Sequence, residues 1–118
     1  MPRKASNAVV GWENEGQLKA AVLSRWQWNP LIRAMCNAQD NRHGYKTGLG
    51  EGSADVLVIV APLGRAAWFE FKMPGKDAEP HQAKWLRDMQ TCGCFACVVH
   101  SIEEAEAGLK RAQEGLLG

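Results

Sequence analysis

The 118-residue sequence contains no long apolar run. No stretch approaches the roughly 20 apolar residues of a membrane-spanning helix, so we expect no membrane protein. The basic start, Met1 to Lys4, is not followed by the apolar segment of a signal peptide. We therefore expect a cytoplasmic protein. Internal repeats and low-complexity segments are absent as well, which leaves an ordinary globular domain.

The sequence also lacks a strong excess of either charge. Fourteen Lys and Arg residues face thirteen Asp and Glu residues, for a net charge of +1. Nucleic-acid-binding domains often have a larger basic excess, so this balance neither supports nor excludes a phosphate-rich partner. The length suits a single core. We predict one domain over residues 13–118, preceded by an N-terminal arm of residues 1–12.

The cysteines lack the paired spacing of a zinc knuckle. Cys92, Cys94 and Cys97 lie close together in the sequence. However, Cys94 and Cys97 flank the start of a predicted strand and should face opposite sides of it. We therefore predict buried structural thiols in place of a metal site, reduced as is usual for a cytoplasmic protein.

Hydrophobic periodicity and capping residues predict three helices and four strands. Asn14 and Ser101 are good first caps for helices, and Pro80 suits a first helical turn. The expected helices cover residues 14–28, 80–92 and 102–113, and the expected strands cover 31–39, 56–60, 66–72 and 95–100, with a loop at 40–52. The order α-β-β-β-α-β-α predicts an α/β sandwich with a mixed sheet.

The predicted hairpin of residues 56–72 brings three charged residues together. A turn centred on residues 62–63 places Asp55 opposite Glu70, and directly opposed residues share one face of a sheet. Because side chains alternate along a strand, Lys72 lies on that face too. Charged groups rarely enter such an apolar segment without partners.

Two carboxylates at this spacing favour a divalent cation between them. Mg²⁺ binds one or two carboxylates and keeps room for water and phosphate oxygens. A metal at Asp55 and Glu70, with Lys72 as a compact positive charge beside it, would suit phosphodiester hydrolysis. The alternative is a surface ion pair on an edge strand, with Asp55 as an ordinary strand-start residue.

The motifs of this region occur in an order that resembles a known family. They are Gly52-Ser53-Ala54-Asp55, Glu70-Phe71-Lys72, Gln82 in the next helix, and Ser101-Ile102-Glu103-Glu104 after the last strand. Over about residues 13–112 they resemble the VRR-Nuc domain family of the PD-(D/E)XK nuclease superfamily. The resemblance implies a restriction-endonuclease-like αβββαβ core, with a mixed central sheet flanked by helices. Ala54 departs from the family, which usually has proline there.

The resemblance also implies roles for these residues. Asp55 and Glu70 would bind Mg²⁺, or Mn²⁺ in its place, with the Phe71 carbonyl as a further ligand. Lys72 would be the catalytic lysine. An acidic residue of the first helix usually joins such a site. The candidates are Glu15 and Glu13.

We prefer Glu15 because it precedes Leu18 and Val22 by three and seven positions, on the predicted core-facing stripe. Alternatively, Glu15 only stabilises the helix start. Gln82 is either a site residue or a polar residue of an exposed first turn. The predicted catalytic set is therefore Glu15, Asp55, Glu70, Lys72 and Gln82.

The resemblance extends to stand-alone proteins of bacteria and phages that resolve Holliday junctions. It implies a metal-dependent DNA endonuclease acting on branched DNA as a homodimer, in a bacterial or phage-infected cell. The alternative is a non-catalytic DNA-binding or assembly module that keeps the fold. The basic loop around His43 either contacts DNA phosphates or is simply solvated.

Overall fold

The structure is a computed structural model that describes residues 12–36 and 52–118. It confirms the predicted order of elements and the mixed sheet. The elements are α2 (Glu15–Trp26), β2 (Ile32–Cys36), β3 (Val56–Val60), β4 (Arg65–Phe71), α3 (Pro80–Thr91), β5 (Phe95–Val99) and α4 (Ile102–Gln113). Strand residues 37–39 and most of the predicted loop, including His43, lie outside the described residues. So does the arm except Trp12, which packs against the core.

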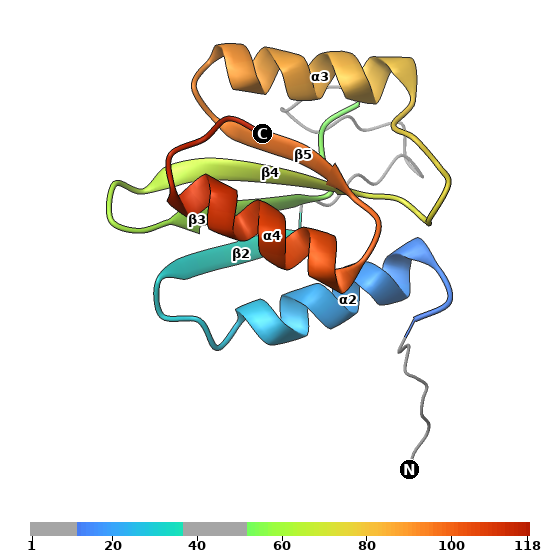
Figure 1. Cartoon of the computed structure of the whole chain (residues 1–118), viewed down its shortest axis with the longest axis horizontal. Helices are drawn as coiled ribbons and strands as arrows, with labels where there is room; N and C mark the ends of the chain where they lie inside the picture. Colours follow the sequence, from blue (N-terminus) through green and yellow to red (C-terminus); the bar gives the residue numbers. More distant parts are fainter. Residues whose placement is uncertain (1–11, 37–51) are drawn as a thin grey trace, which may run out of the picture.

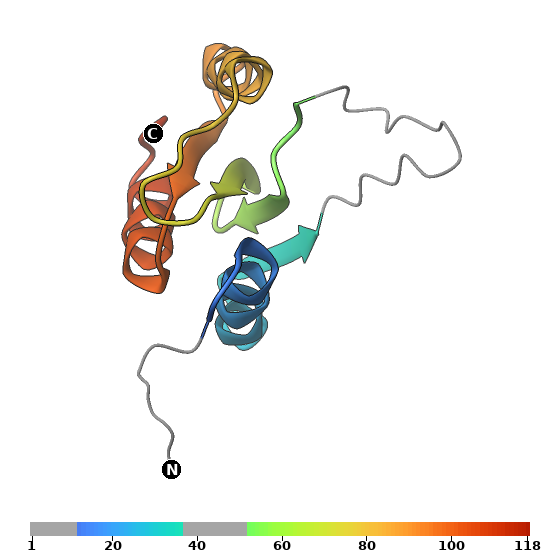
Figure 2. The same ribbon diagram turned by 90° about the vertical axis from the view of Figure 1, so that its right-hand side faces the viewer.

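The four strands of the described chain form one sheet in the order β2-β3-β4-β5. β2, β3 and β4 are antiparallel neighbours, whereas β5 runs parallel to β4. The parallel pair requires a crossover, and α3 provides it. α2 and α4 cover one face of the sheet, and α3 lies on the other (Figures 1 and 2).

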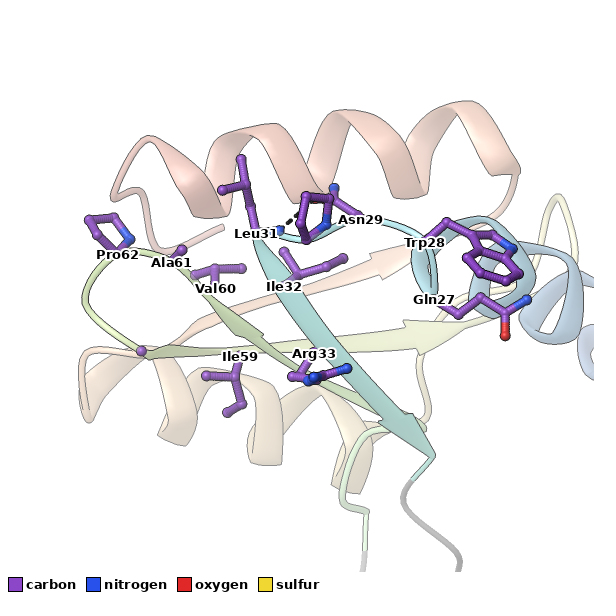
Figure 3. A pocket seen from close by; sticks show the side chains of 12 residues that line it. Gln27, Trp28, Asn29, Leu31, Ile32, Arg33, Ile59, Val60, Ala61 and Pro62 are labelled. Carbon is purple, nitrogen blue, oxygen red and sulfur yellow. Dashed lines mark hydrogen bonds between the residues drawn. The ribbon is translucent and has the colours of Figure 1, made fainter.

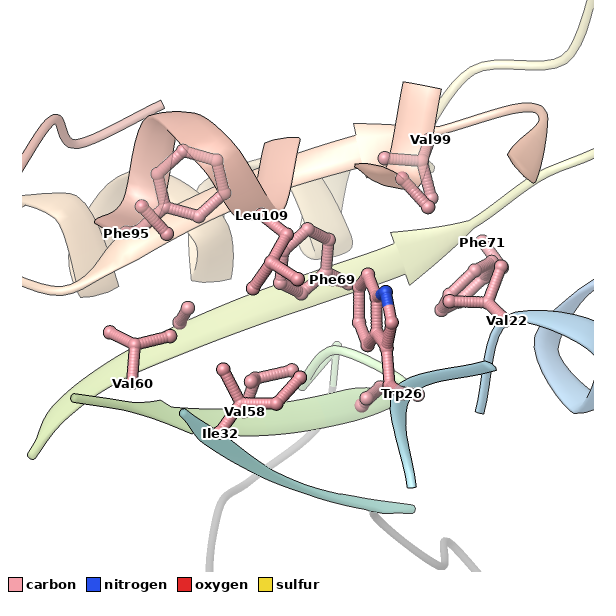
Figure 4. Close-up of a cluster of buried hydrophobic side chains, with 14 of the residues drawn as sticks. Val22, Trp26, Ile32, Val58, Val60, Phe69, Phe71, Phe95, Val99 and Leu109 are labelled. Carbon is pink, nitrogen blue, oxygen red and sulfur yellow. The ribbon is translucent and has the colours of Figure 1, made fainter. Parts of the chain in front are cut away.

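The main core fills the space between the sheet and the helix pair α2 and α4 (Figure 4). Phe69 lies at its centre, with its ring 5.0 Å from Trp26 and 5.5 Å from Phe95 between centroids. Gly108 lets α4 approach closely, because a Cβ atom there would lie 3.0 Å from Cε1 of Phe69. Burying each such aromatic ring stabilises the fold by about 1.5–3 kcal/mol.

A second, smaller core joins α3 to the opposite face of the sheet. Trp68 of β4 and Trp85 of α3 meet edge to face, with 4.9 Å between ring centroids. Leu86 and Ala96 are buried beside them. This contact fixes the position of α3, and with it the residues of the first turn of α3.

The cysteines differ in part from the prediction. Cys97 packs against the main core and Cys94 against the second, so they do face opposite sides. Burial raises the pKa of the Cys97 thiol to about 12. Cys92, however, is exposed, because it caps the end of α3 and does not enter the strand. The prediction of a buried thiol is wrong for Cys92, and Cys94 and Cys97 are half-buried.

Two negative findings apply to the described residues. They contain no group of three or more His, Cys, Asp or Glu side chains placed to hold a metal. No helix within 12–36 or 52–118 combines the length and apolarity needed to cross a membrane.

Candidate functional site

The register of the hairpin brings Asp55 and Glu70 together as predicted. Val56 pairs with Phe69, so the next step along the two strands places Asp55 beside Glu70. The Phe71 N–H donates a hydrogen bond to Oδ2 of Asp55 over 3.0 Å. Since the N–H and C=O of a strand residue point to the same side, the Phe71 carbonyl also points toward Asp55.

Glu70 is the most unusual residue of this group, because its carboxylate is buried. Only 2% of the residue is exposed. Its Oε2 accepts a hydrogen bond from Nε2 of Gln82 over 3.2 Å and lies 3.9 Å from Nζ of Lys72. Its Oε1 is buried and has no hydrogen-bond partner among the described residues. Burying a carboxylate oxygen without a partner costs free energy, and a positively charged ligand at this atom would offset that cost.

The surroundings of Glu70 raise its pKa from the usual 4.5 to about 8. Burial is the largest cause, and the neighbouring negative charge of Asp55 is the next. Lys72 lowers the pKa. The charge of Glu15 raises it, and so does the hydrogen bond that Glu70 would donate to the Asp55 carboxylate once it is protonated. In the absence of a cation, this site therefore favours a proton on Glu70 at neutral pH.

Gln82 is held at both ends of its side-chain amide. Its Oε1 accepts a hydrogen bond from the Glu79 N–H over 2.8 Å, and its Nε2 donates to Glu70. The first contact caps α3, and the second reaches β4. Gln82 is therefore not simply a residue of an exposed first turn. It orients Oε2 of Glu70, whereas Oε1 has no partner among the described residues.

The segment between Lys72 and α3 is tied to the end of β5. The Lys72 N–H donates to the Val99 carbonyl over 3.0 Å. The two ring nitrogens of His100 lie 2.8 Å from the Lys76 carbonyl and 2.8 Å from Oε1 of Glu104. Both partners only accept hydrogen bonds, so the contacts favour a charged imidazole, and the Glu104 hydrogen bond raises the pKa of His100. These contacts hold the chain that follows Lys72.

Gly52 shows why the chain before Asp55 needs a glycine. Its φ of +86° suits glycine, and a Cβ atom there would lie 2.6 Å from the backbone oxygen of His81. The segment between Gly52 and Asp55 therefore begins in close contact with the first turn of α3. The sequence motif included Gly52 but did not predict its contact with His81. A glycine at this position is itself a sign of such a close backbone approach.

We expect Gly52→Ala to impair the protein more than the same change at another positive-φ glycine. Gly93 has φ of +93°, and a Cβ atom there would meet no other atom within 4 Å, so Gly93→Ala is the matched control. Both variants carry the left-handed backbone cost of roughly 1–2 kcal/mol. Gly52→Ala should lower the free energy of unfolding by about 1–3 kcal/mol more, through overpacking against His81. Chemical denaturation measures both, and equal losses would contradict the close contact.

The predicted helical acid is less well placed than the strand residues. Glu15 is the first residue of α2 and is exposed, as is Glu13. The buried stripe of α2 begins at Leu18, so it does not extend to Glu15 as we expected. Glu15 nevertheless lies close enough for its charge to raise the pKa of Glu70. Its role as a site residue stays a prediction.

The residues present fit a divalent cation of the Mg²⁺ class. Asp55, Glu70 and the Phe71 carbonyl offer only oxygen ligands, which hard cations prefer. The partnerless Oε1 of Glu70 and the raised pKa of this carboxyl both show a lack of positive charge at this point. A bound cation would supply that charge, and Lys72 stands beside the same carboxylate.

Comparison with known proteins supports the fold. The sequence matches no protein-family model. It also matches no curated protein. One solved structure, named "VRR_NUC domain", is 21% identical with a TM-score of 0.61, and the match covers 81% of this chain and 94% of that one. Another, named "VRR_NUC domain protein", is 18% identical with a TM-score of 0.64, over 88% and 91% of the two chains. The chain therefore has the fold of these VRR_NUC domain structures, as predicted.

Proposed function

We propose that this chain is a metal-dependent nuclease that hydrolyses DNA phosphodiester bonds at the site of Asp55, Glu70 and Lys72. One observation carries the proposal: the buried Oε1 of Glu70 has no partner within the described residues, beside a second carboxylate and 12%-exposed Lys72. A carboxylate oxygen buried without a partner is costly, and a bound catalytic cation would offset that cost. The fold shared with VRR_NUC domain structures points the same way.

The proposed roles follow from the contacts. Asp55, Glu70 and the Phe71 carbonyl would hold the cation, and Gln82 keeps Glu70 oriented. Bound Mg²⁺ or Mn²⁺ would supply a water of lowered pKa and neutralise charge on the phosphate. The Lys72 ammonium, held near Glu70, would position the attacking water or stabilise the negative charge that develops on the phosphate. Glu15, exposed at the start of α2, would contribute a further negative charge.

The preferred substrate in this proposal is branched DNA, and the active form is a homodimer in the cytoplasm of a bacterial or phage-infected cell. The fold supports a dimer at one edge: β2 pairs only with β3 among the described strands. Trp28, Leu31 and Met35 beside this edge are 81%, 57% and 48% exposed. Two copies related by a two-fold axis would present two sites to two DNA strands.

The test is cleavage of a labelled four-way junction, a flap and a linear duplex, each with Mg²⁺, with Mn²⁺ and with EDTA. We expect cleavage that depends on the metal, is lost in EDTA, and is fastest on the junction. Cleavage of the linear duplex alone would contradict the branched substrate but not the nuclease. No cleavage of any DNA with either metal would contradict the enzyme and favour the non-catalytic module.

A further inference from the structure

The sheet face that carries the proposed site continues beyond it over β2 and β3. Asp55, Leu57 and Ile59 alternate with the core residues of β3, so they point to the face on which α3 lies. α3 packs mainly on β5 (Figure 2). The second core joins α3 to β4 through Trp68. Leu57 and Ile59 remain half-buried. No described helix packs over the β2 side of this face.

Among the described residues of β2 and β3, Arg33 is the cation on this face. It pairs with Ile59 in the β2–β3 register, so the two side chains share the face. Figure 3 shows both pointing to one side of the sheet, whereas Leu31 and Pro62 point to the other. Arg33 is exposed and borders a hollow of about 510 Å³. It makes no hydrogen bond or ion pair with any residue in the described part of the chain.

The distance from the site to Arg33 matches a short stretch of DNA. Ile59 follows Asp55 by four positions. At about 3.3 Å per strand residue this is about 13 Å. One DNA strand advances about 3.4 Å per nucleotide along the duplex axis, so about 13 Å spans roughly four phosphates.

We propose that Arg33 binds a backbone phosphate of the DNA, about four nucleotides from the bond that is cut. This inference rests on the proposed function. It adds Arg33 as a second point, or anchor, that holds the DNA besides the metal site. A guanidinium that has no partner among residues 12–36 and 52–118 matches the charge and the bidentate geometry of a phosphate. The half-buried Leu57 lies between the two anchors and provides an apolar surface there.

The first test compares Arg33→Ala with Lys110→Ala. Lys110 is an exposed cation of α4, on the opposite side of the sheet, so its removal matches the charge change alone. DNA binding is measured with Ca²⁺ in place of Mg²⁺, to prevent cleavage. Arg33→Ala should raise the Kd about 3- to 10-fold and reduce the salt slope of log K by about 0.9. Its kcat at saturating DNA should stay within about 2-fold of the wild type, and Lys110→Ala should change none of these values.

The second test locates the phosphate. A neutral methylphosphonate is moved one position at a time along each strand of a substrate with a single mapped cut. At one position, about four nucleotides from the cut, it should weaken wild-type binding as much as Arg33→Ala does. At that position it should cause no further loss in Arg33→Ala, because the two changes remove the same contact.

The outcomes separate the inference from the proposed function. If the wild type cuts DNA but Arg33→Ala binds it as Lys110→Ala does, the phosphate anchor is wrong and the nuclease remains. The anchor is also wrong if, at every position, the loss of DNA affinity caused by the methylphosphonate adds fully to the loss caused by Arg33→Ala. It is wrong as well if Arg33→Ala changes the mass of the protein in solution, because this face would then bind a second copy of the chain. If the wild type neither binds nor cuts DNA, both proposals fail.

Discussion

Replacing Lys72 by methionine should lower the rate of DNA cleavage by about 10³-fold while the fold and the metal site remain. Methionine keeps the apolar stem of the side chain, which is only 12% exposed, and removes the ammonium 3.9 Å from Oε2 of Glu70. Loss of one well-placed charged or hydrogen-bonding group at a developing negative charge typically costs about 10²- to 10³-fold in rate.

Metal binding provides the diagnostic part of this prediction. Lys72 carries the same sign of charge as the cation, so its removal should leave Mn²⁺ affinity unchanged or higher, as measured by electron paramagnetic resonance. Lys72→Arg should not restore cleavage, because a planar guanidinium does not replace a compact ammonium. Lys110→Met, on the far side of the sheet, is the control. Cleavage by Lys72→Met within about 10-fold of the wild type would contradict the catalytic role.

Replacing Glu70 by glutamine should have two opposite effects. Mn²⁺ binding and cleavage should be lost, because the change removes a charged oxygen ligand. The metal-free protein should become more stable, because a buried carboxylate with a partnerless oxygen is replaced by a neutral group of the same shape. We expect a gain of about 1–3 kcal/mol at pH 8.5, or roughly 4–10 °C in Tm.

The stability gain should depend on pH in a defined direction. The pKa of Glu70 is raised to about 8 in the folded chain, against 4.5 as its usual value. The folded state therefore binds a proton more tightly, and the stability from protonated Glu70 is complete below about pH 4.5 and lost as the pH rises through 8. Glu70→Gln should thus gain little at pH 5 and most above pH 8. Thermal denaturation in EDTA, with Glu103→Gln as an exposed control, measures this.

A lower Tm for Glu70→Gln than for the wild type at pH 8.5 would contradict the cost assigned to the buried carboxylate. Retained Mn²⁺ binding would contradict its role as a ligand. The two readouts are independent, so the site assignment and the energetic argument can fail separately.

The sequence was sufficient for the parts of the site that local rules control. The turn at residues 62–63 and the alternation of side chains place Asp55, Glu70 and Lys72 on one face, and the observed register agrees. Capping residues also predicted the helix starts: Asn14 and Ser101 each accept a hydrogen bond from the backbone N–H three residues later. Both rules depend on neighbours in the sequence or on a single hairpin.

The remaining contacts depend on how distant elements pack. Gln82 reaches Glu70 only because Trp85 packs α3 against Trp68, and no local pattern fixes that approach. The contact between Gly52 and His81 has the same origin. Glu15 is exposed because the first turn of α2 buries no side chain before Leu18. Helical periodicity describes a direction around an axis, and it does not give the depth to which a residue is buried.

The two cores described above differ in what a damaging mutation would do to the organism that carries this chain. The larger core, around Phe69, holds two helices against the sheet, so a damaging mutation there should unfold the protein. The smaller core, around Trp68 and Trp85, chiefly holds the helix that orients Glu70. A mutation there would displace α3 and the Gln82 side chain that binds Glu70, while the contacts of the larger core remain. Under the proposed function, such a chain would bind DNA without cutting it, so selection would act against it as a competitor and not as a simple loss.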